Sequence, residues 1–122
     1  MRLKHITKYL FLACLLTTLT ATAQTNRVKA DHYFNEAARI SLFPPGTIDT
    51  AVLKQCIGLY TKAIRYNPQF SQAYRNRGRC YADLGMYPNA IADVTKAIKY
   101  DRQGNREALY RQRAKYVAKL KR

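Results

Sequence analysis

The residues of this chain best suited to chemistry are two series of cations spaced four apart. One series is Arg75 and Arg79, and the other is Arg111, Lys115 and Lys119. Residues four apart lie on the same side of an α-helix, and like charges stacked in this way cost helix stability. The spacing therefore predicts two charged stripes suited to an anionic partner, with a solvated charged face as the alternative interpretation.

Catalytic or metal chemistry has little to be built from in this sequence. Seven acidic residues are spread along the chain, and the two histidines are His5 and His32. The sequence shows no Ser-His-Asp arrangement, no paired carboxylates and no glycine-rich phosphate loop. Cys56 and Cys80 do not form a CxxC motif. We predict a protein that is not an enzyme, with no catalytic residues, no metal and no cofactor.

The elements that must position the cations are indicated by an internal repeat. When the chain is shifted by 34 residues against itself, seven of thirteen positions between Ile57 and Gln69 recur identically. The recurring residues become Ile91, Thr95, Lys96, Ala97, Ile98, Tyr100 and Gln103. A period of 34 residues with helical spacing of apolar residues indicates repeated pairs of amphipathic helices.

The stretch from Ser71 to Gly104 resembles a complete tetratricopeptide repeat (TPR). The aromatic, small and apolar positions of that family are occupied by Tyr74, Gly78, Tyr81, Gly85, Tyr87, Ala90, Val94 and Ala97. Arg102 stands where the family usually has proline. The resemblance extends from about Val28 to the C-terminus, although only the central repeat is regular, and the chain as a whole looks like a small exported bacterial TPR protein.

The resemblance implies an all-α fold, a short right-handed α-solenoid of antiparallel helix pairs. It divides residues 24–122 into a diverged repeat at about 28–70, a regular repeat at 71–104 and a capping helix at about 105–121, because the open edge of a repeat array must be covered. The expected repeat core is Tyr74, Gly78, Tyr81, Ala90, Val94 and Ala97.

Five helices are expected along this part of the chain. The first runs from about Val28 to Leu42 and stops before Phe43-Pro44-Pro45-Gly46, where the connection is seven residues longer than in the regular repeat. Asp49 or Thr50 begins the second helix, which ends near Tyr66. Ser71 is expected to cap the third helix, and Pro88 suits the first turn of the fourth. The fifth runs from Arg106 to about Leu120.

The N-terminus has the plan of a secretory signal peptide. A positive start is followed by an apolar run and by a small-residue site at Ala21-Thr22-Ala23, which predicts cleavage before Gln24. Removing residues 1–23 lowers the net charge from +15 to +12. We therefore expect a periplasmic or secreted protein; a retained membrane anchor, or a lipoprotein processed at Cys14, are the alternatives.

The remaining cysteines, Cys56 and Cys80, are predicted to be buried. Both lie on the apolar faces of their helices, and Cys56 takes the small-residue position that Ala90 occupies in the next repeat. An oxidising compartment would allow them to bond. Free buried thiols are the favoured interpretation, and the sequence leaves their redox state open.

The resemblance also separates structural charges from candidate ligands. In TPRs similar to this one, residues placed as Arg77 and Asp93 form an ion pair between the two helices of a repeat. In the first repeat both members are absent, because Glu36 and Leu59 take their places. We predict a structural ion pair between Arg77 and Asp93.

The family lines a concave groove with the first helix of each repeat, which would place the cations there. The groove residues expected to bind a ligand are Arg75, Asn76, Arg79, Arg111, Lys115 and Lys119. The family's carboxylate-binding pattern is matched only at Asn76; the other positions hold Phe34, Ala38, Ala108 and Gln112. Recognition of chaperone tails is therefore not inferred.

Three functions remain open at this stage. The favoured one is an exported adaptor that docks an acidic protein segment in the basic groove. The second is general binding of an envelope polyanion such as lipopolysaccharide, acidic glycan or lipid headgroups. The third is a subunit that self-associates through the apolar edge of its first helix. Specific nucleic-acid binding is not expected, because most of the ten tyrosines fall at core positions. The oligomeric state is open.

Overall fold

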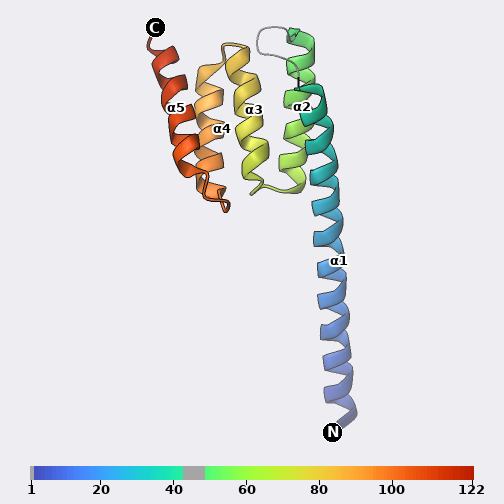
Figure 1. Cartoon of the computed structure of the whole chain (residues 1–122). Helices are drawn as coiled ribbons and strands as arrows, with labels where there is room; N and C mark the ends of the chain where they lie inside the picture. The colour runs from blue at the N-terminus through green and yellow to red at the C-terminus, as the bar shows by residue number, and fades with distance from the viewer. Residues whose placement is uncertain (1, 43–48) are drawn as a thin grey trace.

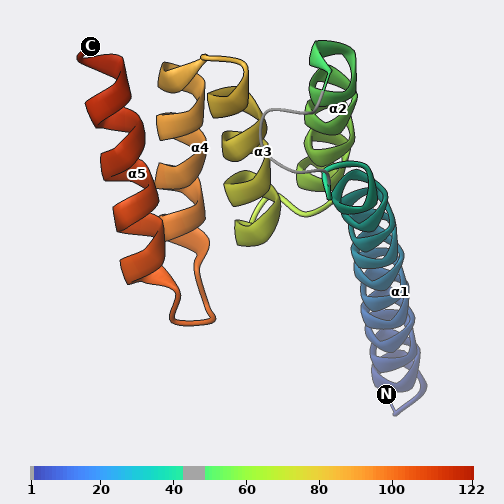
Figure 2. The ribbon, with the colours of Figure 1, turned by 45° about the horizontal axis from the view of Figure 1, so that its top comes forward.

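The computed structural model describes residues 2–42 and 49–122, and within these ranges every regular element is an α-helix. The five helices are α1 (Arg2–Ile40), α2 (Thr50–Tyr66), α3 (Ser71–Asp83), α4 (Tyr87–Tyr100) and α5 (Arg106–Leu120). Each helix packs against the next one in the chain, which gives the stack of helix pairs seen in Figures 1 and 2. The predicted all-α solenoid of helix pairs is confirmed.

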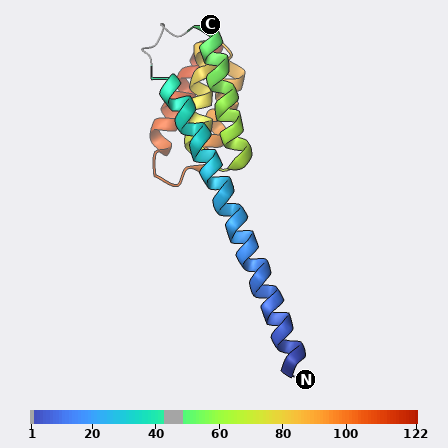
Figure 3. The ribbon, with the colours of Figure 1, turned by 90° about the vertical axis from the view of Figure 1, so that its right-hand side faces the viewer.

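Helix α1 is much longer than the expected first repeat helix. It begins at Arg2 instead of near Val28, and its N-terminal half extends beyond the other helices as a straight rod (Figure 3). Residues 2–25 are exposed throughout. Among the described residues, α1 is the one helix long and apolar enough to cross a membrane, and it lies near the N-terminus.

The ends of the shorter helices follow local sequence rules. Asp49 caps α2, as predicted, because its Oδ1 accepts a hydrogen bond from the Ala51 N–H at 3.4 Å. Pro88 lies in the first turn of α4, also as predicted. Gly85 and Gly104 have φ values of 76° and 77°, a backbone conformation that glycine adopts without steric cost.

The predicted cap of α3 is wrong. Phe70 occupies the N-cap position without a side-chain cap bond. The Ser71 hydroxyl instead donates to the Ala97 carbonyl at 2.7 Å and so joins α3 to the end of α4. The predicted stop at Phe43-Pro44-Pro45-Gly46 and most of the longer connection lie outside the described residues.

Two apolar clusters hold the stack together. The first, between α1, α2 and α3, is built around Ala37, Cys56, Tyr60 and Ala63, and the second joins α3, α4 and α5. The second cluster contains the buried residues Tyr74, Ala90, Val94, Ala97, Leu109 and Tyr116. Of the six residues expected in the repeat core, only Tyr81 is half-buried; the other five are buried. Helix α3 contributes to both clusters and so connects the α1–α2 pair to α4 and α5.

Candidate functional site

Helices α3 and α5 together line a groove with a volume of about 630 Å³. All six residues predicted to bind a ligand lie in its wall: Arg75, Asn76, Arg79, Arg111, Lys115 and Lys119. The i, i+4 spacing places each cation series along one side of its helix. The fold therefore brings the two stripes to one hollow surface.

The floor of the groove is made by Tyr116 and Gln112 of α5. Tyr116 is 8% exposed, and the Gln112 Nε2–H donates to its hydroxyl oxygen at 2.8 Å. Burial raises the pKa of Tyr116, and this hydrogen bond together with nearby Arg79 and Arg75 partly opposes that rise. The phenol therefore stays neutral beneath the arginines and offers a fixed polar floor.

Gln112 leaves one acceptor unused on the floor. Its Oε1 atom is buried and has no hydrogen-bond partner within residues 2–42 and 49–122. A buried carbonyl oxygen without a donor costs free energy. In the sequence, Gln112 stands out only as a mismatch to the family's carboxylate-binding pattern.

The positive charge of the groove is weakly offset. Glu107 lies 3.7 Å from Arg111, but both side chains are largely exposed, at 88% and 75%. Pairs of this kind contribute little to stability. Asp83 is the acidic residue in the wall of the groove. Five cations thus face one acid across a surface that a ligand can reach.

Arg77 lies on a different side of α3 and has a structural role. Its Nε–H and Nη2–H donate to the two carboxylate oxygens of Asp93, both at 2.7 Å, and its Nη1–H donates to Thr61 Oγ1 at 3.0 Å. The hydrogen bonds to Asp93 raise the pKa of Arg77. The ion pair joins α3 to α4, and the threonine contact adds α2. Arg77 and Asp93 are used in packing and do not line the groove.

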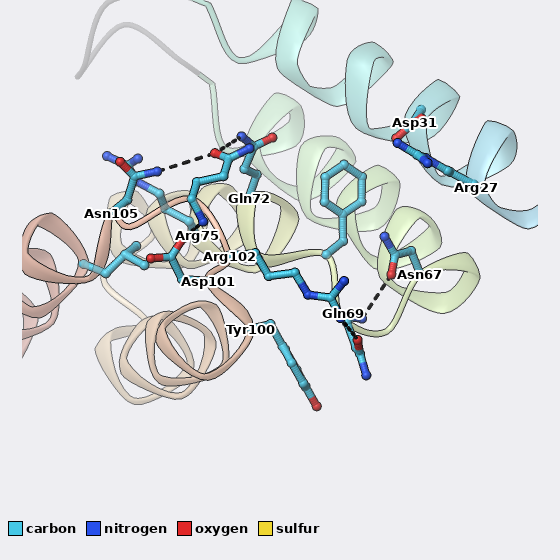
Figure 4. A pocket seen from close by; sticks show the side chains of 14 residues that line it. Arg27, Asp31, Asn67, Gln69, Gln72, Arg75, Tyr100, Asp101, Arg102 and Asn105 are labelled. Carbon is cyan, nitrogen blue, oxygen red and sulfur yellow. Dashed lines mark hydrogen bonds between the residues drawn. The ribbon is translucent and has the colours of Figure 1, made fainter.

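A second cavity of about 480 Å³ lies at the N-terminal end of α3 (Figure 4). Arg75 lines both cavities. Arg27 of α1 and Arg102 also line the second one, together with the polar side chains of the two connections that precede α3 and α5. Among residues 2–42 and 49–122, no three histidine, cysteine, aspartate or glutamate side chains cluster so as to hold a metal ion in either cavity.

Asp101 is the least exposed charged residue of this second cavity. It is 9% exposed, its Oδ1 accepts the Gln103 N–H at 3.0 Å, and its Oδ2 has no donor among the described residues. Nothing in the sequence pattern distinguished Arg27 or Asp101 as lining residues, because they are far apart in the chain and line one cavity only in the folded structure.

Cys56 and Cys80 are buried and free. Burial raises the pKa of both thiols, in the case of Cys80 to about 12. Thiols of this kind are chemically inert in the folded state. They belong to the packing between α2 and α3 and lie outside both cavities.

Comparison with known protein families finds a match in the middle of the chain. Residues 59–92 match the family described as "Tetratricopeptide repeat". The match begins in the second half of α2, includes all of α3 and ends within α4. Repeat arrays of this kind present extended concave surfaces that bind other molecules.

The relatives are similar over the same part of the chain. Hsp70-Hsp90 organizing protein 1 of Glycine max is 45% identical over 42 residues, which is 34% of this chain and 7% of that protein. Hsp70-Hsp90 organizing protein 2 of Arabidopsis thaliana matches with the same identity and extent. This chain therefore spans only a small fraction of the length of these relatives.

The fold is also similar to a solved TPR structure. The TPR2B domain of yeast Sti1, determined in complex with pHsp70, superposes with a TM-score of 0.52 and 26% sequence identity. The superposition covers 83% of this chain and 68% of that one. The likeness extends the TPR architecture beyond the central pair.

Proposed function

We propose that this protein is a non-enzymatic TPR adaptor that binds an acidic protein segment in the groove between α3 and α5. One observation carries the proposal: five cations and Asn76 from two helices line a single 630 Å³ groove that contains one acid. A segment with two or more carboxylates would pair with these cations through charge-assisted hydrogen bonds.

The groove also offers contacts to a peptide backbone. Gln112 lines the groove, and its side-chain amide is of the kind that pairs with a peptide backbone. Asn76 in the opposite wall supplies both a donor and an acceptor. Side-chain carboxylates would select the ligand and backbone contacts would fix its register, as in other modes of peptide recognition.

The likeness to a TPR domain solved with pHsp70 supports a protein ligand for this groove. The chain departs from the family's carboxylate-binding pattern at most positions, as the side chains of Phe34, Ala38 and Ala108 illustrate. We therefore propose an acidic internal segment as the ligand, in place of a chaperone tail.

Charge-matched variants test this function. The probe is a synthetic peptide with four glutamates separated by serines, with a glutamine version as control, measured by titration calorimetry against the full chain in mild detergent. Arg75→Glu/Arg79→Glu should weaken binding by about tenfold or more. Lys62→Glu/Lys96→Glu, which makes the same charge change on α2 and α4, should leave affinity within about twofold.

The outcome separates a defined groove from general polyanion binding. If both double variants weaken binding equally, the charge acts diffusely and the adaptor proposal fails. If the glutamine peptide binds as well as the glutamate peptide, the cations do not select the ligand. Either result would favour the alternative of an envelope polyanion surface.

We further propose that this is an exported bacterial protein whose residues 1–23 are a cleaved signal. The two buried residues of α1, Ala30 and Ala37, both follow the expected junction, so cleavage would remove no buried side chain. N-terminal sequencing of the protein from its native envelope should give Gln24. A retained Met1, or a lipid on Cys14, would overturn the cleavage proposal in favour of a membrane anchor.

A further inference from the structure

Helix α5 presents a second surface, on the side facing away from α4. An apolar depression of about 480 Å³ lies there. It is lined by Tyr110, Arg113, Ala114, Val117, Ala118 and Lys121. Tyr110 is 54% exposed, which is a high value for an aromatic residue that the repeat pattern assigns to a core position. This face is separate from the basic groove.

The internal repeat shows what this face is equivalent to. Residues 109–117 align with residues 73–81 at an offset of 36. Leu109 and Tyr116 pack toward the preceding helix pair, as their equivalents Ala73 and Cys80 do in α3. Helix α5 therefore docks on α4 in the way that α3 docks on α2.

The opposite face of α3 is covered by α4. Tyr74 packs in one cluster with Ala90 and Val94 of α4, and a Cβ atom at Gly78 would lie 3.2 Å from Asp93 Cβ. The equivalents of Tyr74 and Gly78 in α5 are Tyr110 and Ala114. In the part of the chain that the structure describes, no helix covers them.

Arg113 identifies the charge that the missing helix would carry. It is the equivalent of Arg77, whose guanidinium is held by the two oxygens of Asp93. The Arg113 Nε atom is buried and has no acceptor in residues 2–42 and 49–122. A buried guanidinium N–H without an acceptor costs free energy that a carboxylate would recover.

We propose that the outer face of α5 docks an amphipathic helix from a partner protein that carries one carboxylate among small apolar residues. The carboxylate would bind Arg113 as Asp93 binds Arg77, and small residues would lie against Ala114 as Ala90 lies against Gly78. The partner helix thus completes the helix pair that α5 begins. This interpretation replaces that of α5 as a terminal cap, and it does not depend on the groove.

The helix that already fills this position once in the molecule provides the probe. A capped synthetic peptide with the sequence of residues 87–100 contains two lysines and one aspartate, so its net charge is positive and the basic groove does not attract it. We expect it to bind the full chain saturably, one peptide per chain, and to gain helical circular dichroism on binding. Replacing Asp93→Asn in the peptide should weaken binding by about tenfold.

Variants of the chain locate the site. The Arg113→Met chain should also bind the aspartate peptide about tenfold more weakly. It should bind the aspartate and asparagine peptides with equal affinity, because Arg113→Met in the chain and Asp93→Asn in the peptide remove the same interaction. Arg75→Glu/Arg79→Glu, on the groove, should leave binding unchanged. The inference is overturned if no saturable binding occurs, if the Asp93→Asn peptide binds the unaltered chain equally well, or if the groove variant loses the peptide. Light scattering that shows dimers dissolved by Tyr110→Glu would also overturn it, since a second copy would then be the occupant.

Discussion

The Arg77–Asp93 pair is the charged contact most deeply built into the stack. The two side chains are 16% and 8% exposed and meet at 2.7 Å. Asp93→Asn would leave the arginine buried without its counter-charge, and we expect it to lower the free energy of unfolding by about 3 kcal/mol. Urea denaturation followed by circular dichroism measures this loss.

Two controls make that measurement specific. Glu107→Gln removes an exposed pair and should cost less than about 0.5 kcal/mol. Arg77→Met/Asp93→Leu removes both charges and should recover most of the loss; the first repeat already has a leucine, Leu59, at the position of Asp93. A large loss of stability in the double variant would show that the ion pair makes a net contribution to stability, beyond offsetting the cost of burying its two charges.

The three thiols differ in exposure, which gives a second test at this scale. Burial raises the pKa of Cys80 to about 12 and also raises that of Cys56, so both thiols remain neutral at pH 8. Because the thiolate is the reactive form of cysteine, both are expected to be unreactive. Cys14 is exposed. In the folded full chain, with residues 1–23 still present, we expect a thiol reagent at pH 8 to label Cys14 alone, and Cys14→Ser to abolish labelling until urea is added. Rapid labelling of native Cys14→Ser would contradict the buried packing of α2 against α3.

At the scale of the helix pair, two glycines with opposite surroundings provide a matched prediction. A Cβ at Gly78 would lie 3.2 Å from the Ala90 carbonyl and 3.3 Å from Val94 Cγ2, whereas a Cβ at Gly58 would meet nothing within 4 Å. Gly58→Ala should raise stability by up to about 1 kcal/mol through helix propensity. Gly78→Ala should lower it by about 1–2 kcal/mol because α4 must move away.

Thermal unfolding of the two glycine variants, each compared with the unaltered chain, checks the sign of both effects. The repeat itself supports the first, since Ala92 occupies the position in α4 that Gly58 occupies in α2. Equal effects at the two positions would mean that α3 and α4 are not in close contact at Gly78.

Helices α2 to α5 could be predicted from the sequence because punctuating residues mark their ends. Asn67-Pro68, Pro88 and Gly104 each stop or start a helix through backbone geometry alone. The cap of α3 could not, because the Ser71 hydroxyl has a competing acceptor, the Ala97 carbonyl, that exists only after α4 has packed. Local patterns do not report such tertiary competition.

The N-terminal extension of α1 was missed for a different reason. No glycine or proline precedes Pro44, so no local signal breaks the helix. The threonine hydroxyls donate hydrogen bonds to backbone carbonyls three or four residues earlier, as Thr17 does to the Cys14 carbonyl at 2.8 Å. These bonds leave the helix intact. The cleavage site proposed before Gln24 therefore coincides with no break in the helix.

The groove was predictable as two stripes but not as a complete site. The i, i+4 spacing on α3 and α5 placed the cations, because helical periodicity fixes which side of a helix they occupy. The unused acceptor of Gln112 and the second cavity beside Arg27 and Asp101 depend on how distant helices pack. Spacing within one helix carries no information about those contacts.

For the whole molecule, the packing of the helices explains how a strongly basic chain gathers positive charge on one surface. The first helices of successive pairs, α3 and α5, share the groove, and the N-terminal half of α1 extends away from it (Figure 1). A ligand in the groove would therefore contact cations from two helices at once. It would be attracted more strongly than by the same charges scattered over the surface.

The most direct test of this account is a map of where an acidic peptide binds. Amide chemical shifts of the isotope-labelled full chain in detergent micelles, followed during titration with the glutamate peptide, report the contact residue by residue. We predict that the shifts gather at residues 75–79 and 111–119, with none of similar size around Lys62 and Lys96. Shifts spread evenly over the basic residues of all helices, or confined to one of the two groove helices, would contradict it.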